Sequence, residues 1–220
     1  MSRTHAKTLV LNAKSAGTAI GAFNVILLEH AEALVAGAEL AKLPVILQIS
    51  ENCVSYHKAL KPISVATIAI AESASVPVSV HLDHAESEDL VKEALDLGYD
   101  SVMFDGSRKP LQQNIDETAA IAEMAHAAGI SCEGEIGFVG YSGGESSNGT
   151  DPEEAAKFAR ESGADAIAIS VGNVHLQQDK EGGLDLERIA QIEALTSVPL
   201  VIHGGSGVPV EQRRHLSAQT

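Results

Sequence analysis

Several histidines and carboxylates stand at the ends of short apolar segments of this 220-residue sequence. His84 ends one such segment, His175 follows a second, and His203 ends a third. Three imidazoles from separate strands, with a fourth position left open, are typical of a catalytic zinc site. A lone histidine at a strand end is more often a loop or packing residue. Spacing alone therefore leaves both interpretations open.

Other polar side chains stand at the same kind of position. They are Asn24, Gln48, Ser50, His81, Asp83, Asp105, Glu133 and Glu135. In parallel β/α barrels, active sites lie at the carboxyl ends of the strands. On a straight strand Asp83 and His84 point to opposite faces, unless the chain turns there. Imidazoles and carboxylates gathered on one face are more than a solvated rim requires.

A glycine-rich segment, Gly204-Gly205-Ser206-Gly207, directly follows His203. Glycines let backbone amides face outward, and the segment Val208-Pro209-Val210-Glu211 is typical of a helix start. Amides and a helix N-terminus after the seventh strand form a phosphate site in many barrels. A flexible turn is the alternative, because a single glycine-rich loop is a weak signal.

The polar, glycine-rich segment 140–149 follows the fifth apolar run. A segment of this composition buries few apolar contacts, so we expect it to be mobile. It is either a lid that carries Glu145 toward the site or an ordinary surface loop. The sequence does not decide between the two.

The elements that must position these residues follow a repeating pattern. Seven short apolar runs, most of them opened by Pro or Gly, alternate with helical patterns. The runs are AIGAFNV, PVILQIS, PVSVHLD, GYDSVMFD, GISCEGEIG, GADAIAIS and PLVIHGG. Such runs, rich in β-branched residues, are typical of parallel strands buried on both faces. Their alternation with helices predicts an α/β fold with a parallel sheet.

Helix boundaries are marked by capping residues. Apolar stripes at helical spacing cover residues 31–38 and 90–95, and the second is closed by Gly98, a typical C-terminal cap. Asp151 precedes Pro152, which suits the first turn of a helix. The sequence therefore predicts a helix that begins at Pro152.

Seven β/α units without a domain break favour a TIM (β/α)8-type barrel over an open sheet. An eight-stranded barrel typically needs ~250 residues. The eighth β/α unit is therefore missing from the sequence shown. We expect residues 1–220 to be a single catalytic barrel domain that is C-terminally incomplete.

The formal net charge of −15 narrows the classes of partner. A protein field of this sign repels nucleic acid and anionic membranes, so neither is an expected partner. The N-terminus has no apolar signal core, and no apolar run reaches the ~20 residues of a membrane helix. Cys53 and Cys132 have no metal or redox spacing, which indicates reduced thiols in a cytoplasmic protein.

A set of sequence strings resembles a known family. The strings, in order, are AFNV, PVILQIS, HLDHAES, SVMFDGS, EGEIG, TDPEEAAKFA, LDLERIAQI and VPLVIHGGSGVP. Together they resemble the class II, metal-dependent fructose-bisphosphate and tagatose-bisphosphate aldolases over about residues 8–212. HLDH and HGGSG, flanked by the other strings, make the resemblance highly specific.

The resemblance implies a zinc centre. His84, His175 and His203 match the zinc ligands of the family. Asp105 and Glu135 match carboxylates near the metal that serve in alternate or second-site coordination. The cofactor implied is therefore Zn²⁺.

The resemblance also implies how substrate is held and cleaved. Asp83 matches the general acid/base that handles the proton of the C4 hydroxyl. Glu145 is a candidate for the base that exchanges a proton at the enediolate carbon. A monovalent cation, Na⁺ or K⁺, often assists phosphate binding in the family. The matching substrate-binding positions are Gly204, Gly205 and Ser206 for phosphate, and Asn24 and Ser50 on the substrate side.

The implied activity is reversible cleavage of fructose 1,6-bisphosphate, or tagatose 1,6-bisphosphate, into dihydroxyacetone phosphate and glyceraldehyde 3-phosphate. This places the enzyme in carbohydrate metabolism, with glycolysis as the implied pathway. Members of the family commonly form homodimers or homotetramers.

Two alternatives stay open, an aldolase for a different ketose and a non-catalytic subunit that supports another aldolase. The missing eighth strand and Leu176, which stands where the family commonly has Gly, favour the non-catalytic subunit. Retention of every candidate ligand argues against it.

Overall fold

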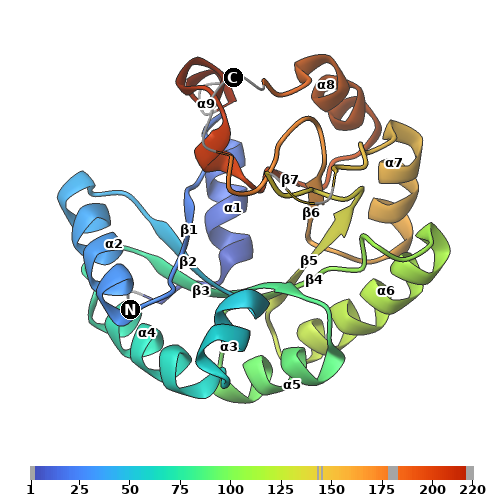
Figure 1. The fold of residues 1–220 in the computed structure, drawn as a ribbon. Coiled ribbons are helices and arrows are strands. Elements are labelled where there is room, and N and C mark those ends of the chain that lie inside the picture. The colour runs from blue at the N-terminus through green and yellow to red at the C-terminus, as the bar shows by residue number, and fades with distance from the viewer. Residues whose placement is uncertain (1–2, 143, 145, 178–182, 217–220) are drawn as a thin grey trace. The chain divides into compact units, whose positions relative to one another are not determined.

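Strand and helix alternate along the chain, as the blue-to-red colouring of Figure 1 shows. The computed structural model describes residues 3–142, 144, 146–177 and 183–216. The chain divides into two compact units. The first extends to Phe104 and includes Glu123–Cys132, and the second comprises Asp105–Ala122 and the residues from Glu133 onward.

The first unit contains four parallel strands in chain order, with β1 paired to β2, β2 to β3, and β3 to β4. Its elements are α1 (Ala6–Ser15), β1 (Ala22–Asn24), α2 (Leu28–Ala41), β2 (Val45–Ser50), α3 (Glu51–His57), α4 (Lys61–Ser73), β3 (Val78–Ala85), α5 (Glu88–Leu97) and β4 (Ser101–Phe104). The register places Gln48 beside His81 and Ser50 beside Asp83. Polar ends of β2 and β3 thus lie side by side.

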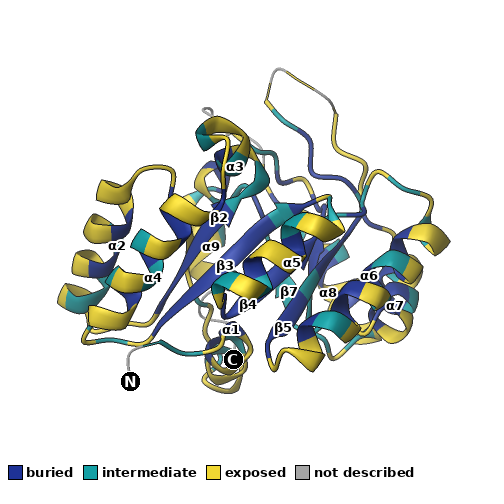
Figure 2. Cartoon of the chain, turned by 90° about the horizontal axis from the view of Figure 1, so that it is seen from below, coloured by how far each residue is buried: buried dark blue, intermediate teal, exposed yellow. Residues whose placement is uncertain are grey.

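Strands β2, β3 and β4 lie in the core of the first unit, whereas the residues of β1 are exposed. Nearly every residue of β2 and β3 is buried, as expected for parallel strands covered on both faces. Figure 2 shows these strands in dark blue, whereas α2 and α4 carry buried and exposed residues side by side. The apolar stripe of α2 is buried at Ala31 and Val35, which confirms the predicted amphipathic helix.

The predicted caps are present at two helices. The Ser87 hydroxyl accepts a hydrogen bond from Leu90 N at the start of α5, and Gly98 ends the helix with φ +80°. Asp151 accepts hydrogen bonds from Glu153 N and Glu154 N at the start of α7. These bonds satisfy amides that the helix itself leaves unpaired, which explains the boundaries.

The second unit pairs β5 with β6 and β6 with β7, again in parallel. Its elements are α7 (Pro152–Glu161), β6 (Ala166–Ile169), α8 (Leu186–Leu195), β7 (Leu200–Val201), the 3₁₀ turn η1 (Gly205–Gly207) and α9 (Val210–Leu216). Helix α6 (Leu111–Ala127) and β5 (Ser131–Ile136) contribute residues to both units. Phe158 of α7 packs in a core with Ile167, Ile169 and Ile192.

The described residues form seven strands in the order β1 to β7, which confirms the predicted α/β topology. The first and last strands are shorter than their apolar runs suggest, since β1 spans Ala22–Asn24 and β7 only Leu200–Val201. Among the described residues, no helix is long and apolar enough to cross a membrane.

Candidate active site

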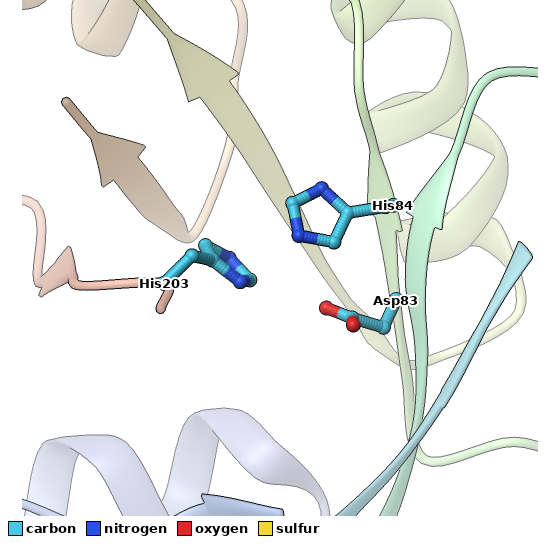
Figure 3. A group of neighbouring side chains, drawn as sticks. All are labelled: Asp83, His84 and His203. Carbon is cyan, nitrogen blue, oxygen red and sulfur yellow. The ribbon is translucent and has the colours of Figure 1, made fainter. Parts of the chain in front are cut away.

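The end of β3 supplies two adjacent reactive side chains, Asp83 and His84. His84 adopts φ +50°, a left-handed conformation that non-glycine residues seldom take. The pairing of β3 with β4 shifts register between Leu82 and Ala85, as at a β-bulge. The bulge breaks the alternation of a straight strand. Both side chains therefore project on the same side of β3 (Figure 3).

Asp83 is held in place from the neighbouring strand. Its carboxylate is 2% exposed, and Oδ1 accepts a hydrogen bond of 2.8 Å from Gln48 Nε2. This hydrogen bond keeps the buried carboxylate in one orientation. Gln48 stood among the strand-end residues in the sequence but was not predicted to belong to the site.

His81, the first residue of the HLDH motif, has a different environment from that of Asp83. It is buried, and its Nδ1 lies 2.7 Å from Ser101 Oγ of β4. The ring is thus bonded to a side chain inside the first unit.

The two predicted substrate-side residues differ in setting. Asn24 is exposed at the end of β1, in register with Gln48. The Ser50 hydroxyl accepts a hydrogen bond of 3.2 Å from Cys53 N and so caps α3. Ser50 therefore caps a helix, a role that was not predicted from the sequence.

Neither Cys53 nor Cys132 forms a disulfide and both are buried, as predicted for reduced thiols. Burial raises the pKa of the Cys53 thiol, whose sulfur bonds to Val25 O at 3.4 Å. Since the thiolate is the reactive form, Cys53 is not an activated nucleophile.

In the second unit, His203 follows β7 and faces a carboxylate. Its Nε2 lies 2.9 Å from Oε1 of Glu133, and the imidazole is almost fully buried. Figure 3 shows His203 on the segment that leaves β7. Glu133 was not predicted as a site residue. The signal was available, because Glu133 and Glu135 are two apart on one strand and share a face.

His175 belongs to the same unit and comes after β6. Its ring centroid lies 6.0 Å from that of His203, with an angle of 50° between the planes. The structure thus brings two of the three predicted ligands close together within the second unit.

The carboxylates Asp105 and Glu135 are each oriented by their neighbours. Asp105 Oδ1 accepts hydrogen bonds from the backbone N and the hydroxyl of Ser107, at 3.1 and 2.6 Å. Glu135 is buried, and its Oε1 accepts from Val139 N at 3.3 Å. Both groups come from chain segments directly at strand ends, as predicted.

The glycine-rich segment after His203 is a defined turn. Gly204 has φ +66°, and a Cβ there would lie 2.6 Å from Val174 O, so only glycine fits. Gly205–Gly207 form a 3₁₀ turn, and α9 begins at Val210, close to the predicted helix start. The segment therefore forms a left-handed residue followed by a 3₁₀ turn.

Two further predictions concern loop residues. Glu145 lies outside the described residues. Leu176 has φ +57° and is 77% exposed, so the chain directly after His175 adopts a conformation that favours glycine. Leucine at this position is therefore conformationally strained.

Comparisons with known proteins agree with the motif resemblance. The sequence matches the family described as "Fructose-bisphosphate aldolase class-II" over residues 4–219. It is 40% identical to a 6-phospho-5-dehydro-2-deoxy-D-gluconate aldolase of Shouchella clausii over 211 residues, which are 93% of this chain and 71% of the relative. It is 37% identical to a fructose-bisphosphate aldolase of Geobacillus stearothermophilus over 218 residues, 96% of this chain and 76% of the relative.

Among solved structures, the YdjI aldolase from Escherichia coli K12 superposes with a TM-score of 0.86 at 30% sequence identity. The match covers 97% of this chain and 76% of that chain. The fold is therefore of the TIM-barrel type. The chain belongs to the class II fructose-bisphosphate aldolase family and is an aldolase, a lyase.

Proposed function

We propose that this chain is a zinc-dependent class II aldolase that reversibly cleaves fructose 1,6-bisphosphate, or tagatose 1,6-bisphosphate. The products are dihydroxyacetone phosphate and glyceraldehyde 3-phosphate. The observation that carries the proposal is the bulged end of β3, which presents Asp83 and His84 on one side of the strand in a member of this family.

The donor set fits a zinc ion. His84, His175 and His203 would hold it, with Asp105 and Glu135 as nearby carboxylates for alternate or second-site coordination. Imidazole nitrogen and carboxylate oxygen are donors that Zn²⁺ prefers, and three histidines leave one position for substrate. When bound, zinc supplies Lewis-acid stabilisation of the negative charge that develops on the ketose carbonyl oxygen.

Glu133 prepares His203 for this task. A carboxylate 2.9 Å from Nε2 favours the tautomer that carries its proton there and its lone pair on Nδ1. Histidine ligands commonly donate their other ring N–H to a carboxylate, which fixes the ring and increases its basicity. Glu133 is therefore a positioning residue in the proposal.

Asp83 accepts and returns the proton of the C4 hydroxyl. As the C3–C4 bond breaks, its carboxylate takes the proton of the C4 hydroxyl, and it returns that proton in the reverse direction. Gln48 Nε2 donates a hydrogen bond of 2.8 Å to Oδ1 and so orients the carboxylate. The buried setting keeps the carboxylate in one orientation.

The turn after His203 binds the phosphate of dihydroxyacetone phosphate in this proposal. Gly204, Gly205 and Ser206 would offer backbone amides, assisted by a monovalent cation, Na⁺ or K⁺. Asn24 and Ser50 would contact substrate from the first unit. The defined 3₁₀ turn supports this role, because amides held in place lose less entropy when an anion binds.

The wider setting belongs to the same proposal. We infer a single catalytic barrel domain that assembles as a homodimer or homotetramer in the cytoplasm and acts in glycolysis. Both cysteines are buried and outside any disulfide, which supports a reducing compartment.

A second candidate substrate has a specific observation in its favour. The relative from Shouchella clausii, at 40% identity, is a 6-phospho-5-dehydro-2-deoxy-D-gluconate aldolase. The same residues would cleave that ketose by the same chemistry.

The test is cleavage of these three ketoses by purified protein, before and after EDTA treatment and after zinc is added back. We expect activity with fructose or tagatose 1,6-bisphosphate that EDTA removes and Zn²⁺ restores. Activity only with the gluconate derivative would select the second candidate. Stoichiometric zinc without cleavage of any ketose would contradict the catalytic proposal and favour a non-catalytic subunit.

A further inference from the structure

The ring of Tyr141 stacks on the imidazole of His175. Their centroids lie 4.9 Å apart, and the planes differ by only 28°. Another tyrosine–histidine pair, Tyr56 and His57, has the same centroid distance but an edge-to-face angle of 85°. Tyr141 therefore covers a face of the His175 ring, whereas Tyr56 touches its histidine at an edge.

Backbone hydrogen bonds hold this stack in place. His175 N donates to Gly140 O at 2.8 Å, and Ser142 N donates to His175 O at 2.9 Å. These bonds form a short parallel bridge in which Tyr141 and His175 are partners. Because the backbone is bonded on both sides of Tyr141, its main chain is held beside that of His175.

The loop that carries Tyr141 is anchored at its base. Phe138 and Asn148 exchange two backbone hydrogen bonds of 2.9 and 2.8 Å. Ser147 Oγ accepts from Gly140 N at 3.0 Å and donates to Asn173 O at 3.3 Å. The described part of the loop after β5 is thus attached to the segment that precedes His175.

The same segment is connected to the second histidine of this unit. Asn173 Nδ2 donates to His203 O at 3.0 Å, and its Oδ1 accepts from Val171 N at 2.8 Å. The amide of this buried side chain therefore links the backbones that carry His175 and His203. Their 6.0 Å ring separation is maintained by contacts outside the two imidazoles.

We propose that Tyr141 is a positioning residue of the metal centre, which holds the His175 imidazole in the orientation that a zinc ion requires. This inference rests on the proposed function. A ligand ring that is already restrained loses less rotational freedom when the metal binds. A metal-bound imidazole is also electron-poor, so its contact with the electron-rich face of a phenol ring is strengthened.

The test is Zn²⁺ affinity of the full chain, measured by competition with a chromophoric chelator, in Tyr141→Ala and Tyr141→Phe variants. Loss of an outer-shell partner typically weakens metal affinity about 10–100-fold, and we expect a loss in this range for Tyr141→Ala. Tyr141→Phe keeps the stacked ring and should restore wild-type affinity. Tyr56→Ala, which removes the exposed edge-to-face pair, is the matched control and should bind zinc normally.

The visible spectrum of the Co²⁺-substituted protein gives a readout of ligand geometry. We expect Tyr141→Ala to change the d–d bands, whereas Tyr141→Phe and Tyr56→Ala leave them unchanged. Tyr141→Leu, which keeps apolar bulk without a planar ring, should resemble Tyr141→Ala. An unchanged spectrum and affinity in both the Ala and Leu variants would overturn the positioning role.

A double-mutant cycle with His175→Ala separates this inference from the proposed function. If Tyr141 acts through His175, Tyr141→Ala has no further effect on Zn²⁺ affinity once His175 is absent. Additive losses would overturn the positioning role while leaving the zinc site intact. Absence of Zn²⁺ binding by the wild-type protein would instead overturn the proposed function, and the positioning role with it.

Discussion

At the end of β3 the backbone conformation itself directs the His84 side chain, whereas at the exits of β6 and β7 other side chains hold the histidines in position. The direction of the His84 side chain is set by its own left-handed φ and by the bulge in the pairing of β3 with β4. His175 and His203 depend on partners distant in sequence, Tyr141 and Glu133.

The two regions differ in what holds the side chains in position: a strained backbone in one, and partner side chains in the other. A non-glycine residue in the left-handed region costs about 1 kcal/mol or more, which the packing around the strand must offset. A ring held by a stack or a carboxylate is unstrained, but its position is lost when the partner is removed. We therefore expect substitutions beside β3 to lower activity while leaving the position of His84 unchanged. In the second unit, we expect substitution of Tyr141 or Glu133 to alter the position of the histidine that it contacts.

Removal of His84 should have the largest effect. His84→Ala deletes a predicted ligand and the group that the bulge presents. We expect loss of stoichiometric Zn²⁺ binding and a turnover equal to that of the EDTA-treated protein. Elemental analysis and the ketose cleavage assay measure both. Full activity in this variant would contradict the assignment of His84.

Removal of Asp83 should separate chemistry from metal binding. Asp83→Ala leaves the histidines in place, so zinc content should stay at the wild-type level. Turnover should fall ~10²–10⁴-fold, the usual contribution of a positioned acid/base group. Loss of zinc along with activity would mean that Asp83 is a metal ligand instead.

Gln48 offers a smaller change at the same strand ends. Gln48→Leu removes the amide that donates to Asp83 Oδ1 and puts an apolar side chain of similar size in its place. A hydrogen bond to a charged group contributes about 1.5–3 kcal/mol, so we expect kcat to fall about 10–100-fold. Zinc affinity should be unchanged, in contrast to Tyr141→Ala. An unaltered kcat would show that β3 alone orients Asp83.

Leu176 tests the strain next to His175. Leu176→Gly relieves a left-handed residue whose side chain is largely exposed, and we expect stability to rise by up to ~1 kcal/mol. Leu40→Gly is the matched control, because this exposed leucine lies in α2, where glycine costs about 1 kcal/mol. Thermal melts of both variants give the comparison. Destabilisation of equal size in the two would exclude strain at Leu176.

The last prediction concerns how the stability of the first unit depends on alkaline pH. Burial raises the pKa of Tyr99, whose hydroxyl lies 2.6 Å from Ser64 Oγ. Above about pH 10 the unfolded chain loses this proton and the folded protein keeps it, so stability falls by up to ~1.4 kcal/mol per pH unit.

Below that pH the contribution of Tyr99 is fully present. Tyr99→Phe removes the ionisable group, and we expect a shallower decline of the free energy of unfolding between pH 10 and 11, measured by urea titration. The same slope in wild type and variant would mean that Tyr99 does not set the alkaline limit.

Much of the fold follows from local patterns. The proline before Val45 and the apolar run after it predict β2 correctly, and Asp151 with Pro152 predicts the start of α7. These signals succeed because capping, strand propensity and burial act within a few residues. The short extent of β7 was not predictable, because the left-handed turn at Gly204 ends the pairing earlier than hydrophobicity suggests.

The amino-acid sequence alone determined the α/β alternation, the family motifs and the candidate residues at the strand ends, since each depends on spacing along one segment. Only the tertiary structure decided that Asp83 and His84 share a side of β3, that Glu133 faces His203, and that Tyr141 covers His175. The physical reason is that a bulge, a hydrogen bond between side chains and a ring stack each need a second chain segment. Such partners are selected by packing and leave no regular spacing in the sequence.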